Sequence, residues 1–461
     1  MDNLSKMQRI KLLLVCLITG LSLFAQTGDF IIRNVSILKV EEGIMQPGMT
    51  VIVRKGEIAA IFPQDRPVPL QNLTVIDGKG KYLVPGLAEM HAHIPTPVEG
   101  DDALVKETLF LYLSNGITTI RGMLGAPYHL QLREAVHKGD MLGPRIFTSS
   151  PSLNGNSIPD VETAKLKVTQ YKNDGYDFLK LHPGLKLDVF NAITQTAKSV
   201  GIPFSGHVSI LVGIDRALDA QYASIDHLDG YAEGLVPASL QLDPASNGFF
   251  GFNFTDQMNV GLAEALAKKT KTKSVWVVPT QSLFDRWLSP DDPQRLATAP
   301  EMQYMDPKTR YAWVQTKTGF IKDKAYSAAK YARYRTARYV LLQALHNAGV
   351  NFLLGSDAPQ VFNVPGFSIQ HEMQGLAAAG LPNADIIRSG TINPAIFFKQ
   401  KNQFGSIEAG KAADLVLLNA NPLEDISSMA KIAGVMVRGQ WLSREKIDSE
   451  LQKMAQKYAK E

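Results

Sequence analysis

Cysteine is almost absent from this 461-residue chain. The single cysteine, Cys16, lies within an apolar run near the N-terminus. Beyond that run the sequence excludes a disulfide framework, a cysteine nucleophile and a cysteine metal site. Any transition metal bound there must take its ligands from histidine, aspartate, glutamate or a modified lysine.

An excess of charge of either sign is also missing. The chain has 48 Lys and Arg against 44 Asp and Glu, which gives a formal net charge of +4. Such a balance disfavours nucleic acid or an anionic membrane as the partner. The sequence leaves open whether the chain forms a homo-oligomer.

No apolar run is long enough to span a bilayer comfortably. The longest, "LLLVCLITGLSLFA", has about 14 residues, follows Lys6, Arg9 and Lys11, and ends at Ala25. A basic segment, a short apolar run and a small residue predict a signal peptide over residues 1–25. The protein is then expected to be secreted or periplasmic, without stable membrane insertion. A buried N-terminal helix or an uncleaved anchor is the alternative.

The remaining sequence divides into two β-rich ends and a long alternating middle. Residues 26–83 and 398–461 contain short alternating strands, and we expect them to form one small β-sandwich accessory domain with a tail helix. In residues 84–397, eight strand-like runs alternate with helical ones, which predicts an α/β fold, a closed (β/α)8 TIM-like barrel. No glycine-rich phosphate loop follows the first run. Two long connections, 231–274 and 281–335, are expected to form lids or substrate walls.

Polar side chains close five of the apolar runs in this middle region. Because barrel active sites lie at the carboxyl ends of the strands, we expect these side chains to meet. Imidazole and carboxylate suit zinc or a similar divalent ion, and the set is too large for one tetrahedral ion. The sequence therefore predicts two adjacent metal ions, with zinc expected from the ligand types. The predicted ligands are His91, His93, Lys180, His207, His227 and Asp357.

A protonated lysine would repel such ions. If Lys180 is instead N-carboxylated, its carbamate oxygens can bridge both metals. A bridging hydroxide would then be the nucleophile, and Asp357 would be the catalytic group that takes its proton and returns it to the leaving group. A plain lysine that pairs with an acid beside a single metal ion is the alternative.

These motifs resemble the amidohydrolase superfamily, and most closely its imidazolonepropionase and Xaa-Pro dipeptidase-like branch. The resemblance rests on "PGLAEMHAH", "GITTIRG", "DFLKLH", "GHV", "SIDHLDG", "LLGSDAP" and "FGSIEAGKAADLVLLN". It implies that His91, His93 and Asp357 bind the more buried metal ion, that His207 and His227 bind the other, and that carboxylated Lys180 bridges them.

Two features depart from that pattern. Glu89 stands where many relatives have aspartate, and His207 is not followed by the HxxE motif of mononuclear deaminases. The second departure disfavours deamination.

The resemblance implies a metal-dependent hydrolase that cleaves amide C–N bonds of small substrates such as Xaa-Pro dipeptides or N-acyl amino acids. A lactonase or phosphotriesterase remains an alternative, because the same bimetal hydroxide attacks those bonds. A barrel that has lost catalysis and only binds is a second alternative. Tyr231, Arg121 and His182 are the candidate substrate-binding residues, although Arg121 also suits a salt bridge within the scaffold.

Overall fold

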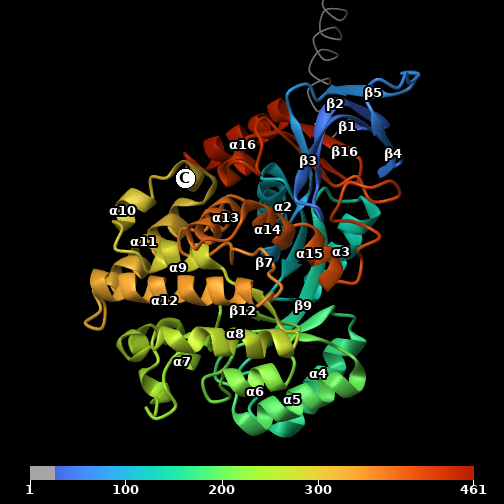
Figure 1. Cartoon of the computed structure of the whole chain (residues 1–461). Helices are drawn as coiled ribbons and strands as arrows, with labels where there is room; N and C mark the ends of the chain where they lie inside the picture. The colour runs from blue at the N-terminus through green and yellow to red at the C-terminus, as the bar shows by residue number, and fades with distance from the viewer. Residues whose placement is uncertain (1–25, 461) are drawn as a thin grey trace, which may run out of the picture.

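The computed structural model describes residues 26–460 (Figure 1). The expected signal peptide and Cys16 therefore lie outside the described residues. Among the described residues, none of the helices combines the length and the apolar character needed to cross a membrane.

Seven parallel strands form most of a barrel, in the order in which they occur along the chain. Their side chains are almost entirely buried. Helices cover one face of each strand and the barrel interior covers the other, so little of either face contacts water. This agrees with the nearly continuous apolar runs in the sequence. The strands are β7 (Leu87–Ala92), β8 (Ile117–Gly122), β9 (Arg145–Leu153), β10 (Phe178–Leu181), β11 (Phe204–Gly206), β12 (Ser224–Asp226) and β13 (Trp276–Val278).

The eighth position of the barrel is filled by an extended segment, residues 351–358, rather than by a regular strand. On one side, Leu353 N donates to Val277 O (2.9 Å); on the other, Met90 N donates to Leu354 O (2.8 Å). Asp357 in this segment has a left-handed backbone with φ of 63°. Contact with the segment that follows β7 continues beyond it, since His93 N donates to Ala358 O (2.8 Å). The predicted barrel is confirmed, with this irregular segment as its closure.

Helices follow the strands and cover the barrel, as the alternation predicted. Between β12 and β13 lies the first long connection, with α7 (Tyr231–Gly234), η1 (Pro244–Ser246), η2 (Phe249–Gln257), η3 (Val260–Leu262) and α8 (Ala263–Thr272). After β13 come α9 (Gln281–Trp287), α10 (Pro293–Leu296), η4 (Pro300–Tyr304), α11 (Pro307–Ile321) and α12 (Ala328–Asn347). The other helices around the barrel are α2 (Ala103–Ser114), α3 (Pro127–Lys138), α4 (Val161–Asn173), α5 (Leu187–Val200), α6 (Ile214–Asp219), α13 (Ser368–Ala378), α14 (Asn383–Ser389) and α15 (Ile392–Phe397).

Both ends of the chain build a second, nine-stranded sheet, which confirms the expected accessory β domain. Antiparallel pairing of β14 with β6 joins the two ends, and apolar side chains from both share one core. Because β6 runs almost directly into β7, this sheet abuts the start of the barrel. Its strands are β1 (Gln26–Thr27), β2 (Phe30–Lys39), β3 (Ile44–Arg54), β4 (Glu57–Pro63), β5 (Thr74–Asp77), β6 (Tyr82–Pro85), β14 (Leu415–Leu418), β15 (Ile432–Val437) and β16 (Gln440–Ser443).

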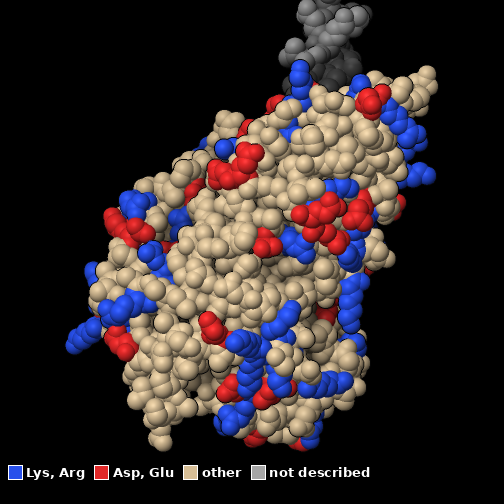
Figure 2. Space-filling model, viewed as in Figure 1, with Lys and Arg blue, Asp and Glu red and all other residues tan. Residues whose placement is uncertain are grey.

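The tail helix α16 (Arg444–Tyr458) leaves this sheet and returns to the barrel. It packs against η4 and α2, so the C-terminal segment reaches the end of the barrel where the strands finish. A short η5 (Ile426–Ala430) precedes β15. On the face shown in Figure 2, basic and acidic side chains are interspersed, without one large field of a single sign.

Candidate active site

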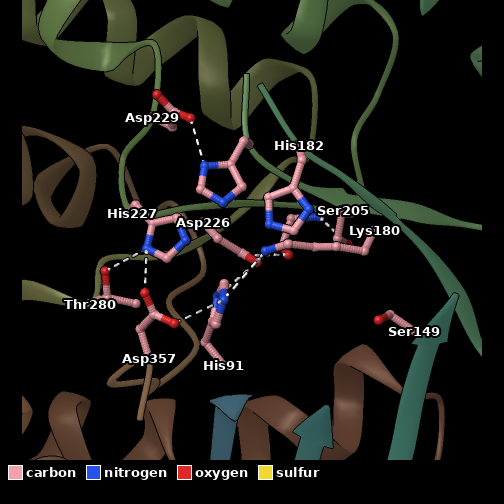
Figure 3. A network of polar contacts seen from close by, with 12 residues as sticks. His91, Ser149, Lys180, His182, Ser205, Asp226, His227, Asp229, Thr280 and Asp357 are labelled. Atoms are coloured by element: carbon pink, nitrogen blue, oxygen red, sulfur yellow. Dashed lines mark hydrogen bonds and ion pairs between the residues drawn. The ribbon is translucent and has the colours of Figure 1, made fainter. Parts of the chain in front are cut away.

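Side chains from separate strand ends point toward one another at the carboxyl end of the barrel (Figure 3). His91 comes from β7, Lys180 from β10, and His227 directly follows β12. Residues this far apart in sequence meet because parallel barrel strands all finish at the same rim. The expected convergence of strand-end residues is therefore present in the fold.

His91, His93 and Asp357 form a group that could hold a metal ion. One ligand atom from each lies within 4.8 Å of the others. Asp357 Oδ1 is 2.7 Å from His93 Nε2 and 3.5 Å from His91 Nε2. Two imidazoles and a carboxylate facing one point match the ligand chemistry of zinc and similar divalent ions.

His207 and His227 lie beside this group. The ring centroids of His227 and His91 are 4.4 Å apart, and those of His207 and His227 are 4.6 Å apart. His207 Nδ1 pairs with Asp229 Oδ2 (3.0 Å), and His227 Nδ1 with Thr280 Oγ1 (2.9 Å). Such partners orient a ligating imidazole and leave its Nε2 available.

Burial keeps these imidazoles in the neutral form. It lowers the pKa of His91, His207 and His227 well below the usual range, with a further lowering from the nearby Lys180 charge for His91 and His207. For His227, the neighbouring histidines add to the effect of burial. A neutral imidazole has a free lone pair, so the donor set fits a divalent ion without a prior proton loss.

Lys180 is fully buried among these groups. Its Nζ lies 3.3 Å from His91 Nε2 and 3.9 Å from Asp226 Oδ2. Burial lowers the pKa of Lys180 to about 8, although Asp226 and Asp357 oppose the shift. An amine that loses its proton this easily can react with CO2, because only the neutral form is nucleophilic.

Gly206 is the last residue of β11 and pairs with Leu181 of β10. No side chain can be accommodated at this position. Its φ is +125°, and a Cβ there would overlap the Leu181 carbonyl oxygen and lie 3.0 Å from Lys180 Cδ. Glycine therefore lets β11 approach Lys180 closely and present His207 at the same rim.

Three other backbone positions at the rim are strained. His227, Thr280 and Asp357 have φ values of 64°, 46° and 63°, in the left-handed region that residues with a Cβ rarely occupy. Backbone strain of this kind persists where the surrounding fold holds it, and it gathers at functional sites.

Asp226 is a site residue that the sequence did not single out. It is fully buried, and it accepts hydrogen bonds from Arg121 Nη2 (3.0 Å) and Ser224 Oγ (2.9 Å). Burial alone would raise its pKa, but Arg121 and Lys180 hold it below the usual range. Asp226 Oδ2 also lies 3.0 Å from His91 Nδ1 without a hydrogen bond between them. The only sequence signal was its place beside His227 in "SIDHLDG".

Two of the three candidate substrate residues are buried and paired within the scaffold. Tyr231 is 0 % exposed, and its hydroxyl pairs with Thr270 Oγ1 of α8 (2.9 Å), so its expected position at the pocket mouth is corrected. Arg121 is also fully buried and binds Met90 O and Asp226 inside the barrel. Both are committed to the scaffold, because a buried hydroxyl or guanidinium must be paired.

His182 does lie beside the cluster. Its ring stacks on that of His207 with centroids 4.7 Å apart, and its Nδ1 pairs with Ser152 Oγ at 2.6 Å. Burial lowers the pKa of His182 to about 2, so the ring is neutral. The strand period that placed it on the same face as Lys180 predicted this proximity.

Glu89 joins the two segments that carry His91 and Asp357. One carboxylate oxygen accepts from His91 N (2.9 Å) and Ser356 N (2.8 Å), while the other accepts from Ser356 Oγ. A buried acceptor shared by both segments fixes their relative position. The residue that departs from the family pattern thus links two halves of the candidate metal group.

Arg338 of α12 supports the rim from outside. It donates to His227 O, Pro279 O and Gln281 Oε1, each at 2.9 Å, and its guanidinium lies over the Phe284 ring. We expect Arg338→Met to lower the free energy of unfolding by about 3 kcal/mol, because three buried acceptors lose a charged donor.

Urea unfolding measures this effect. Arg335→Met on the same helix is the control, since Arg335 is exposed. Equal unfolding midpoints for the two variants would show that Arg338 does not stabilise the rim.

Together, the barrel and the cluster define a barrel protein with a candidate metal centre at its strand ends. The model of the amidohydrolase family matches residues 82–442, and the chain belongs to that family.

Three relatives illustrate the similarity. Bottromycin amidohydrolase superposes with a TM-score of 0.70 at 23 % identity, over 93 % of this chain and 90 % of its own. A Xaa-Pro dipeptidase with bound methionine in its active site gives 0.64 at 20 % identity, over 90 % and 100 %. An adenine deaminase of Ruegeria pomeroyi is 27 % identical over 151 residues, which are 31 % of this chain and 24 % of that protein. The chain thus spans about a quarter of this curated relative's length, and the structural likenesses establish the fold.

Proposed function

We propose that this protein is a metal-dependent hydrolase of amide C–N bonds in small molecules. The observation that carries the proposal is the meeting of four imidazoles, Lys180 and Asp357 at one rim of the barrel. Packing alone does not require so many polar groups at one buried point, because each costs free energy to remove from water.

Two divalent ions, zinc by the chemistry of the donors, are proposed for this site. His91, His93 and Asp357 would hold one ion, and His207 and His227 the other. Lys180, as a carbamate formed from its neutral amine and CO2 with release of one proton, would lie between them. Bound ions would supply Lewis-acid polarisation of the carbonyl and water activation near neutral pH.

Proton transfer in the proposed reaction is assigned to Asp357. Asp357 Oδ1 lies 2.7 Å from His93 Nε2, and Oδ2 lies 3.8 Å from His227 Nδ1, so its carboxylate spans both halves of the site. We propose that it accepts the proton of the attacking water and delivers it to the leaving nitrogen, since an amide nitrogen leaves poorly unless protonated.

The first long connection supplies a wall. Its Phe250 ring lies 5.2 Å from His227 and 5.7 Å from His207, centroid to centroid. Phe250 would keep bulk water from this side of the site, and His182 Nε2 could contact the substrate. Excluding water strengthens every polar interaction made with the reacting group.

Xaa-Pro dipeptides and N-acyl amino acids are the substrate classes we propose first. The likeness to a Xaa-Pro dipeptidase and to an amidohydrolase supports amide cleavage. Deamination of an adenine-like ring is the second candidate, favoured by the matched segments of adenine deaminases. The missing HxxE motif after β11 weighs against deamination.

We also propose that the protein is exported. This proposal rests on the sequence of residues 1–25, in which a basic segment precedes a short apolar run.

Metal analysis and a substrate panel test this proposal. We expect close to two divalent ions per purified chain, and hydrolysis of at least one amide that stops when a chelator removes the metal. The panel should contain Xaa-Pro dipeptides, N-acyl amino acids, adenine, lactones and a phosphotriester. One ion or none would contradict the two-metal site, and turnover of only the non-amide compounds would contradict amide hydrolysis.

A further inference from the structure

A cavity lies beside the candidate metal site. It has a volume of about 350 Å³, and His93 forms part of its lining. Only His93, which is 18 % exposed at its side chain, belongs to both the cavity and the metal group. The cavity therefore adjoins the candidate metal group through His93. Its size is near the low end for small-molecule pockets, which fits part of a ligand rather than a whole large one.

Three distant segments build the walls of this cavity. Leu104 comes from α2, Tyr304 and Trp313 come from the second long connection, and Tyr458 comes from the tail helix α16. Pro359 completes the side next to Asp357. Most of these side chains are apolar or aromatic, so the walls favour an apolar group over water.

The two acids of the cavity already have partners. Glu107 accepts from Lys457 Nζ (2.8 Å) and Tyr458 OH (2.6 Å), and Asp306 caps α11 through Thr309 N (2.8 Å). Among the described residues that line the cavity there is no lysine or arginine. A carboxylate placed here would meet two acids, and the nearby Lys457 is already paired with one of them, which disfavours it.

We propose that this cavity is the specificity pocket of the enzyme and binds an uncharged aromatic or branched aliphatic group of the substrate. The proposal rests on the proposed amide hydrolysis and narrows its substrates. The substrate end that enters this pocket carries no free carboxylate. An acyl amino acid or a dipeptide can therefore bind only with its carboxylate directed away from this pocket.

Leu104 offers a way to change the pocket without disturbing the core. It is 46 % exposed although it lines the cavity, so Leu104→Lys places a cation at the wall at little cost in stability. Leu166→Lys is the matched control. Leu166 is 71 % exposed on α4, and it does not line the cavity.

Steady-state kinetics with two series of amides test the pocket. One series varies the acyl group from acetyl to phenylacetyl, with and without a terminal carboxylate; the other varies the amine in the same way. In at least one series, we expect kcat/KM for the uncharged phenyl compound to be about tenfold or more above that for the smallest compound of the series, which carries acetyl or methyl. Leu104→Lys should reduce this preference about tenfold and improve the carboxylate compounds, while Leu166→Lys keeps it.

Binding without turnover gives an independent readout. Titration of the full chain with 4-phenyl-1-butanol should quench tryptophan emission to saturation, and Trp313→Phe should remove most of that change. Leu104→Lys should weaken the binding about tenfold.

The outcomes separate the two proposals. If the metal-loaded protein hydrolyses no amide, the proposal of amide hydrolysis is wrong, whether or not 4-phenyl-1-butanol binds. If amides are hydrolysed without preference for the apolar group, or if the alcohol binds equally to wild type and Leu104→Lys, the specificity pocket is overturned.

Discussion

Lys180→Ala is expected to lower kcat/KM by at least about 10³-fold and to reduce the metal content below two ions per chain. Lys180 is fully buried, and its Nζ lies 3.3 Å from His91 Nε2, between the two groups of histidines. Without a bridging anion, five ligands remain to hold two mutually repelling cations. A bound metal contributes several kcal/mol to the transition state, and each 1.4 kcal/mol is a factor of ten.

Two readouts separate a bridging role from a structural one. A short carboxylic acid such as propionate should restore part of the activity and metal content of Lys180→Ala, because it can occupy the place of the carbamate. Wild-type protein prepared in ¹³C-labelled bicarbonate should give a carbamate carbon signal that Lys180→Ala lacks.

Lys186→Ala is the control, because Lys186 is exposed a few residues further along the chain. Full metal content and full rate in Lys180→Ala would rule out the carbamate bridge.

Asp357→Asn is expected to reduce kcat/KM for amides by roughly 10²- to 10⁴-fold, the range for loss of a positioned acid–base group. Asparagine has almost the same shape, so the strained backbone at this position and the barrel closure should persist. Its amide cannot accept a proton from the attacking water or return one to the leaving nitrogen.

The dependence on the leaving group distinguishes proton transfer from a general loss of structure. An activated ester needs little protonation of its leaving oxygen, so Asp357→Asn should impair it much less than an amide. Metal content should be measured alongside, because Asp357 also belongs to the candidate metal group. Asp385→Asn, at a half-buried contact with His346 on the outer helices, is the control. Equal losses for the ester and the amide at unchanged metal content would contradict the acid–base role.

The sequence by itself determined the barrel and the accessory sheet. Alternating strand-like and helical runs are local patterns, and parallel strands joined by helices close in few ways. It also indicated which side chains meet at the rim. His91, Lys180 and Asp357 each end an apolar run, and the carboxyl ends of barrel strands must lie together.

Contacts across the fold decided the rest. The pairing of Arg121 with Asp226 and the burial of Tyr231 against Thr270 depend on which neighbour each side chain meets after packing. Local sequence gives no such information, so a tyrosine four residues after His227 suggested the mouth of the pocket and was found in the core. The eighth barrel segment was located by its apolar run, but its irregular backbone follows from its contacts with β7 and β13.

The apolar cavity is the clearest case of a feature that only tertiary structure creates. Leu104, Trp313 and Tyr458 come from segments separated by up to about 350 residues, and none belongs to a recognisable motif. Their proximity depends on the path of the tail helix from the accessory sheet back to α2 and η4. Strand periodicity can fix the chemistry at the rim, because that chemistry lies on the strands. The walls that select a substrate come from loops and helices whose positions are set by long-range packing.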